Sequence, residues 1–207
     1  MADDSILTLS ETQLDALKEV GNVGAGHAAT ALSQLLKKKI MISVPQVKIL
    51  KLQEVENLLG DSNTLVAGII MNFLGDVTGK ILLLLTRESA LSLADMLLQN
   101  PAGTTKVLSE VGNSAIKETG NILSGAYMNA LNEFLGLLLL PSVPSLVFDI
   151  SGAILNSLSE GFEGMSTHIL SIETQFSEAN EKVIKGYLLM VPDIPSLKVL
   201  LSAIKVE

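Results

Sequence analysis

A polar motif that occurs twice is the feature of this chain that most constrains its fold. Asp15, Glu19 and Asn22 follow the spacing D-x3-E-x2-N, and Pro45 comes after 22 further residues. The second copy reads S-x3-E-x2-N with a proline at the same distance, and it consists of Ser114, Glu118, Asn121 and Pro144. The second copy lies 99 residues after the first throughout. A duplication of this kind predicts two related halves.

Each copy of the motif falls on a predicted long helix. Ser10 and Gln13 form a capping-box pattern, S-x-x-Q, which predicts a helix that runs to about Lys38. Ser109 lies 99 residues after Ser10 and predicts the start of an equivalent helix that ends at about Leu138. Apolar residues recur at helical spacing in the first of these segments, as expected for a helix with one buried face.

The segments after each long helix also repeat. We expect an edge strand containing the motif proline, a short helix, a β-hairpin and a final helix. In the first half these segments are 40–50, 52–59, 66–85 and 87–99, and in the second half 139–148, 151–158, 168–191 and 195–204. The pattern predicts one α+β domain over residues 1–207 with internal pseudo-twofold symmetry and half-repeats at about 9–106 and 107–207. We expect a two-layer fold in which two long helices pack on a β-sheet.

The spacing of the motif places its polar side chains together. Residues at i, i+4 and i+7 share one helix face, so Glu19 and Asn22 project side by side, as do Glu118 and Asn121. A carboxylate beside a carboxamide can hold a cationic side chain and orient a water molecule. A solvated helix face with polar residues at ordinary spacing is the alternative for either copy alone. The duplication favours a functional site.

Three glycines interrupt the first predicted helix at Gly21, Gly24 and Gly26. Each costs roughly 1 kcal/mol relative to alanine, so each needs a reason. Their spacing differs from the dinucleotide pattern G-x-G-x-x-G, and Gly75–Lys80 is one residue short of a P-loop. We therefore expect tight helix packing, together with a surface kept bare beside Glu19 and Asn22.

Composition excludes several classes of function. The net charge is −8 and aromatic residues make up 3% of the chain, which disfavours nucleic-acid binding and favours partners that expose lysine or arginine. The chain has no cysteine and two histidines, His27 and His168, so thiolate sites are absent, zinc sites are not expected, and His27 is interpreted as a surface or packing residue. No apolar run reaches the length of a membrane span and no signal peptide is evident, so a cytoplasmic location is expected.

The double motif resembles that of the CheC-type members of the CheC/CheX/FliY phosphatases of bacterial chemotaxis. The segments 18–29 and 117–127 resemble the two hallmark segments of that family, and the resemblance covers essentially the whole chain. Because both copies are intact and no switch domain is recognisable, the chain resembles stand-alone CheC more than CheX or FliY.

The resemblance implies a substrate, the phosphorylated response regulator CheY (CheY-P), and hydrolysis of its aspartyl phosphate. Glu19 and Glu118 would form a salt bridge to the active-site lysine of CheY, while Asn22 and Asn121 would enter the CheY site and orient the attacking water. Asp15, Ser114, Pro45 and Pro144 would be supporting motif positions. Mg²⁺ would be bound by CheY, so no cofactor or metal site is expected in this chain.

The resemblance also implies a second partner, the receptor deamidase CheD, whose binding would stimulate the phosphatase. The segment 148–155 occupies the place of the family's CheD-binding helix, and Asp149 is the expected contact. The alternative is a plain amphipathic helix packed on the sheet. Two other functions remain open: a CheD-binding regulatory module with little catalysis, and a structural component of the flagellar switch.

Overall fold

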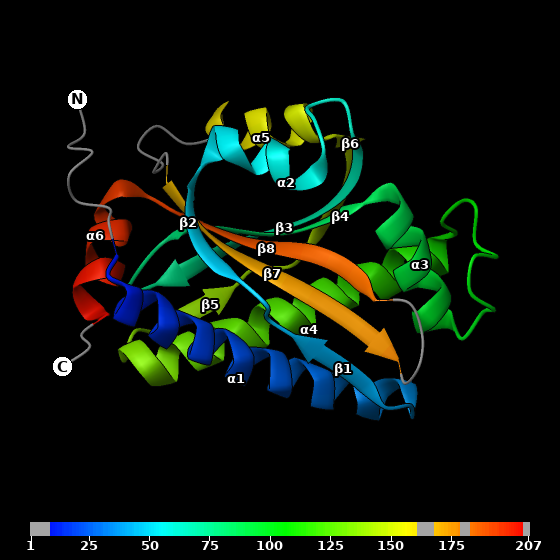
Figure 1. Ribbon diagram of the computed structural model, residues 1–207, viewed down its shortest axis with the longest axis horizontal. Helices are drawn as coiled ribbons and strands as arrows, with labels where there is room; N and C mark the ends of the chain where they lie inside the picture. The colour runs from blue at the N-terminus through cyan, green and yellow to red at the C-terminus, as the bar shows by residue number, and fades with distance from the viewer. Residues whose placement is uncertain (1–8, 161–167, 179–182, 205–207) are drawn as a thin grey trace.

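A curled antiparallel sheet with helices on both faces forms the protein (Figure 1). The computed structural model describes residues 9–160, 168–178 and 183–204. In chain order the elements are α1 (Glu11–Leu36), β1 (Ile40–Ser43), β2 (Val47–Lys51), the 3-10 helix η2 (Leu52–Glu54), α2 (Val55–Leu59), β3 (Leu65–Gly75), β4 (Gly79–Thr86), α3 (Arg87–Leu98), α4 (Glu110–Leu135), β5 (Leu139–Pro141), β6 (Ser145–Ile150), α5 (Ser151–Glu160), β7 (His168–Glu178), β8 (Ile184–Pro192) and α6 (Ile194–Ala203). The predicted α+β class with two long helices on a sheet is confirmed.

The two halves exchange their edge strands. The sheet order is β1-β7-β8-β4-β3-β5, with β2 also paired to β7 and β6 to β3. The strands that follow α1 therefore pair with the hairpin of the second half, and the strands that follow α4 pair with the hairpin of the first half. Neither half completes its part of the sheet alone. The half-repeat boundaries at about 9–106 and 107–207 stay a prediction.

The predicted caps start both long helices. The hydroxyl of Ser10 accepts from the backbone N–H of Gln13 at 3.2 Å, and the Gln13 side chain accepts from the Ser10 N–H at 3.0 Å. The Ser109 hydroxyl accepts from the Gly112 N–H at 3.1 Å. Each helix ends slightly earlier than predicted because the next residue, Lys37 or Gly136, adopts a left-handed conformation that closes the last turn.

The motif prolines lie at the sheet edges, but each divides the single predicted edge strand into two shorter strands. Pro45 separates β1 from β2, and Pro144 separates β5 from β6. Proline has no N–H to donate to a ladder, so a break at the sheet edge accommodates it. Neighbouring groups hold these breaks to the sheet, because the carbonyl of Gln46 accepts from the Glu173 N–H at 2.9 Å and the Ser142 N–H donates to the Asn72 carbonyl at 2.8 Å.

Apolar side chains fill both sides of the sheet. The larger cluster lies between the sheet and the layer of α1, α3, α4 and α6, and it includes the fully buried Phe73, Tyr127 and Phe176. A smaller cluster lies under α2 and α5, which form a thin third layer on the other face (Figure 1). Strand β4 contributes to both clusters because its residues alternate between the two faces. Its apolar run Ile81–Leu85 is accordingly buried throughout.

A buried carboxylate organises the connection between α3 and α4. Asp95 is 2% exposed and accepts hydrogen bonds from the N–H groups of Gly103, Thr104 and Thr105 at 2.7, 3.1 and 3.0 Å. Burial opposes ionisation of this group, but the hydrogen bonds outweigh it and lower the pKa of Asp95. The ionised carboxylate therefore fixes the loop from which α4 begins.

Two helical glycines set how α1 packs. A Cβ atom at Gly24 would lie 3.0 Å from the Cα atom of Tyr127 on α4, and one at Gly21 would lie 3.3 Å from a methyl group of Val44. In the second half, a Cβ atom at Gly120 would lie 2.6 Å from Ile69. A side chain at any of these three positions would press on the facing helix or strand, which confirms the packing interpretation for Gly21 and Gly24.

Candidate functional site

The first copy of the motif forms a polar stripe on the outer side of α1. Asp15, Glu19 and Asn22 are all exposed. The buried residues of α1 centre on Gly21, Gly24 and Ala28, which at 100° per residue lie roughly opposite the stripe. The three side chains therefore point away from the sheet into solvent. None of them forms a hydrogen bond or ion pair with another described residue.

The second copy forms an equivalent stripe on α4. Ser114 and Glu118 are exposed and Asn121 is half-buried. The buried residues Ile116, Leu123 and others lie on the opposite side of the helix, against the sheet. These motif side chains also make no hydrogen bond or ion pair within the described part of the chain. Both stripes are thus unoccupied polar surfaces on the same outer layer.

Glycine extends each stripe by one turn. Gly26 lies four residues after Asn22, and Gly125 lies four residues after Asn121. Apart from the adjacent residues and the backbone of the same helix, no described atom lies within 4 Å of a Cβ built on either glycine. Packing therefore gives no reason for glycine here, in contrast to Gly24. The bare surface predicted beside Asn22 is present, and it is repeated beside Asn121.

The surroundings of the two stripes differ. Val44, which precedes Pro45, is 3% exposed and packs against Gly21, the neighbour of Asn22. Its counterpart Val143, which precedes Pro144, is 88% exposed. The break in the first edge strand is therefore anchored on α1, whereas the break in the second leaves an apolar side chain in solvent. The repeat of the motif at an offset of 99 residues did not predict this difference in exposure between Val44 and Val143.

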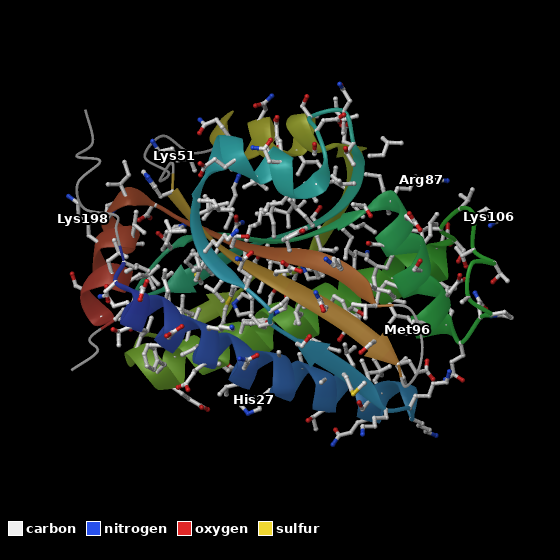
Figure 2. All side chains as sticks on the ribbon, viewed as in Figure 1. His27, Lys51, Arg87, Met96, Lys106 and Lys198 are labelled. Atoms are coloured by element: carbon white, nitrogen blue, oxygen red, sulfur yellow. The ribbon has the colours of Figure 1, made fainter. Side chains whose placement is uncertain are left out.

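The groups that could bind a metal ion near the stripes are the histidine nearest the first stripe and the acidic side chains. His27 is exposed and projects from the outer side of α1 (Figure 2), so it is a surface residue. In the part of the chain that the structure describes, no group of three His, Asp or Glu side chains could hold a metal ion. No described helix is both long and apolar enough to cross a membrane. The stripes can act by charge and hydrogen bonding on a partner that enters from solvent.

Asp149 lies near the end of edge strand β6, on neither of the two helices that carry the motif. It is exposed, and its carboxylate accepts from the N–H of Ile150 at 2.8 Å. The expected CheD-binding segment 148–155 divides between strand and helix, because α5 begins at Ser151. Within α5, Ile154 and Leu155 are buried against the sheet, so the helix packs as the plain amphipathic alternative describes.

A hollow beside Asp149 was not apparent from the sequence. It has a volume of about 280 Å³ and lies between β6, the start of α3 and the start of α4, where Asn113, the residue before Ser114 of the second stripe, lines it. Arg87 and Lys106 lie at its rim and occur at the same end of the molecule (Figure 2), where the Arg87 guanidinium donates to the Lys106 carbonyl at 2.9 Å. Phe148, 47% exposed, forms part of its apolar wall. Long-range packing brings these residues together, so no local pattern predicts the hollow.

Comparison with known proteins agrees with the duplicated motif. A family model described as the CheC-like family matches residues 13–49 and 111–148, which are the segments that carry the two copies. The chain is 36% identical over 202 residues to the CheY-P phosphatase CheC of Bacillus subtilis, with 95% of each chain covered. It is also 29% identical over 125 residues to the flagellar motor switch phosphatase FliY of the same organism, covering 60% of this chain and 32% of that protein.

Solved structures share the fold. The crystal structure of Thermotoga maritima FliY matches with a TM-score of 0.75 at 22% identity, covering 96% of this chain and 98% of that one. The middle domain of H. pylori FliM matches with a TM-score of 0.65 at 10% identity, covering 94% of this chain and 99% of that one. The match to the phosphatase CheC along nearly the whole chain, with the family segments on both motif copies, shows that this protein belongs to the CheC-like family.

Proposed function

We propose that this protein is a CheY-P phosphatase, a hydrolase that removes the aspartyl phosphate of the response regulator through two D/S-x3-E-x2-N sites. The observation that carries the proposal is the pair of Glu/Asn stripes, which face solvent, opposite the core, and have no partner among the described residues. The similarity to a CheY-P phosphatase supports the choice of substrate. That substrate is a cytoplasmic signalling protein, so we place this chain in the cytoplasm.

The glutamates supply the attachment to the partner. In this proposal Glu19 and Glu118 each pair with the active-site lysine of CheY. Both carboxylates are exposed in the free protein, and each would be partly desolvated on docking. Truncating one partner of a desolvated charge pair costs about 2–5 kcal/mol at an interface, so each pair is expected to matter for affinity.

The asparagines supply the chemistry. The carboxamide of Asn22 or Asn121 enters the CheY site, where its oxygen accepts from a water molecule and aligns it with the phosphorus. The water oxygen attacks phosphorus as the bond to the aspartyl oxygen breaks. The products are inorganic phosphate, which takes the oxygen and protons of water, and a free aspartate carboxylate. Positioning of this kind suits phosphoryl transfer, which needs little covalent chemistry from the protein. Mg²⁺ bound by CheY would neutralise charge on the phosphoryl oxygens.

The test is the decay of phosphorylated CheY with the wild-type protein and with Asn22→Ala, Asn121→Ala and the double variant. We expect faster decay with wild type, partial acceleration with each single variant and none with the double variant. Thermal unfolding of each variant controls for folding. Undiminished acceleration by a folded double variant would show that the chemistry lies elsewhere.

CheD binding is a second proposed function, favoured by the hollow beside Asp149. An exposed carboxylate, an apolar wall that includes Phe148, and the rim cations Arg87 and Lys106 together suit a protein partner with both apolar and charged contacts. Because Asn113 lines the hollow and directly precedes Ser114 of the second stripe, CheD bound there would lie beside that stripe, from where it could stimulate the phosphatase.

A charge reversal tests this second function. Asp149→Lys should abolish CheD binding in a pull-down or calorimetric titration while leaving CheD-independent phosphatase activity intact. Glu11→Lys, an exposed reversal at the start of α1, is the charge-matched control and should bind CheD like wild type. Equal CheD affinity in wild type and Asp149→Lys would remove Asp149 from the interface.

A further inference from the structure

Each of the two long helices carries a single lysine and no arginine. In the 26 residues of α1 the lysine is Lys18, and in the 26 residues of α4 it is Lys117. Each directly precedes the motif glutamate and lies four residues before the motif asparagine. The chain has 14 lysine and arginine residues, so the other 12 lie outside these helices. The position of this one cation is therefore repeated together with the motif.

The stability of the helices does not explain these positions. A positive side chain stabilises a helix when it lies in the last turn, beside the negative end of the helix dipole. Neither helix has a basic residue in its last turn, and Lys18 and Lys117 are each the eighth residue from the start. Both lysines therefore lie too far from the helix ends to interact with the dipole.

Ion pairing within the protein does not explain them either. Asp15 lies three residues before Lys18, where an ion pair can form on a helix, but the structure contains no ion pair between them. In the second copy the corresponding residue is Ser114, which has no charge. Neither lysine side chain forms an ion pair or hydrogen bond with any residue that the structure describes. Both charges can therefore act on a partner.

The lysines adjoin the asparagines on the helix surface. Residues four apart on a helix have Cβ atoms about 5–6 Å from each other, so Lys18 is next to Asn22 and Lys117 is next to Asn121. Helical side chains lean toward the N-terminus, so each asparagine leans over the turn that carries the lysine. Lys18 is exposed and Lys117 is half-buried, and each has a flexible four-carbon stem that ends in an ammonium group. A group that contacts the asparagine is therefore close to a positive charge.

The substrate of the proposed reaction requires such a charge. A phosphoryl group carries about 1.5–2 negative charges at neutral pH. Each asparagine that approaches this group is accompanied by a carboxylate, Glu19 or Glu118, on a protein whose net charge is −8. Like charges repel, so these carboxylates disfavour a phosphorylated partner. An ammonium group beside the asparagine offsets the repulsion and donates charge-assisted hydrogen bonds to phosphoryl oxygens.

We propose that Lys18 and Lys117 bind the phosphoryl oxygens of the response regulator and give each site its preference for the phosphorylated form. This proposal rests on the proposed function, because it takes CheY-P as the substrate. The ammonium group contacts the phosphoryl group before and during the attack of water, so it contributes to binding more than to the rate of the bound complex. In this respect the lysines differ from Asn22 and Asn121, which act on the water.

Calorimetric titration with beryllofluoride-activated and with unmodified CheY tests the proposal, because the fluorides stand in for the phosphoryl oxygens. Lys18→Met/Lys117→Met removes both charges and keeps good helix formers. We expect the ratio of the affinities for activated and unmodified CheY to fall about tenfold relative to wild type. Lys18→Arg/Lys117→Arg keeps the charge and should retain most of this ratio. A wild-type ratio in the methionine variant would overturn the proposal.

Lys39→Met/Lys198→Met is the charge-matched control. Both residues are exposed and lie outside the motif, Lys39 before β1 and Lys198 on α6 (Figure 2). The control should have the wild-type affinity ratio, and thermal unfolding checks that each variant is folded. An equal fall of the ratio in the control and in the motif variant would show that net charge alone matters, which overturns the proposal.

Steady-state kinetics separate substrate binding from the chemistry. For Lys18→Met/Lys117→Met we expect the KM for CheY-P to rise about tenfold with a smaller change in kcat. A lower kcat at unchanged KM would contradict a role in binding the phosphoryl group. Failure of the proposed function gives a different result, namely undiminished hydrolysis by Asn22→Ala/Asn121→Ala. If only the lysine proposal fails, that asparagine variant is inactive while the methionine variant behaves like wild type.

Discussion

Gly24 on α1 and Tyr127 on α4 meet so closely that a Cβ atom on Gly24 would lie 3.0 Å from the Cα atom of Tyr127. Tyr127 is 1% exposed, and burial raises the pKa of its hydroxyl to about 12, with an interaction with Thr174 opposing the shift. Neither the tyrosine nor the backbone beside it can move easily. This contact sets the spacing of the two helices, and with it the positions of Asn22 and Asn121.

The contact predicts opposite effects for two neighbouring alanine substitutions. Gly24→Ala should lower the free energy of unfolding by about 1–3 kcal/mol, because the added methyl group overpacks the helix crossing. Gly26→Ala should raise it by about 0.5–1 kcal/mol, because this position is open and alanine is the better helix former. Urea denaturation of both variants measures the difference. Equal effects would show that the crossing can adjust to a methyl group.

The bare surfaces after the asparagines predict a steric block. Gly26→Gln/Gly125→Gln should fold at least as stably as wild type, since glutamine is a good helix former, yet kcat/KM for CheY-P should fall about tenfold, equivalent to 1.4 kcal/mol of lost docking. Gly26→Ala/Gly125→Ala is the control and should keep more activity because it adds one atom at each site. Wild-type kcat/KM in the glutamine variant would place the partner's contact away from these glycines.

Acid should weaken the start of α6 through Asp193. This residue caps the helix by accepting from the Ser196 N–H at 2.7 Å, and it also accepts from the Thr78 hydroxyl. Burial opposes its ionisation, but these hydrogen bonds outweigh it and lower the pKa of Asp193. Its stabilising contribution is therefore fully present above the unfolded pKa of about 3.9 and is lost as the pH falls through the lower folded pKa.

Asp193→Asn isolates that contribution, because asparagine still caps a helix but does not titrate. The variant should unfold near the wild-type Tm at neutral pH and show a shallower loss of Tm below about pH 4. Asp95, whose pKa is also lowered, is unchanged in this variant and should leave some acid sensitivity. Identical Tm profiles for variant and wild type would mean that Asp193 makes no pH-dependent contribution.

Local patterns predicted most of the elements. The Ser10–Gln13 capping box, the Gly75–Gly79 turn and the positions of Pro45 and Pro144 indicated helix starts, a hairpin and edge strands that the structure contains. These signals act within a few residues, where backbone preferences and side-chain hydrogen bonds decide the conformation. Repetition at an offset of 99 then strengthened the predictions that rest on Ser10 and on the two prolines.

Features that depend on long-range packing could not be predicted in this way. Nothing local indicates that β6 pairs with β3 of the other half, that Tyr127 is the residue against Gly24, or that Val143 is exposed while Val44 is buried. The side of α1 that carries Glu19 and Asn22 followed from helical periodicity. The place at which α1 crosses α4 followed only from tertiary packing.

The most direct test of the central claim is the rate of CheY-P dephosphorylation with wild type, with Asn22→Ala/Asn121→Ala, and with Asn57→Ala. Asn57 is an exposed asparagine on α2, across the sheet from both stripes, and serves as the matched control. The account predicts that wild type and Asn57→Ala accelerate dephosphorylation equally and that the double variant, folded by thermal unfolding, does not. Full acceleration by the double variant would contradict it.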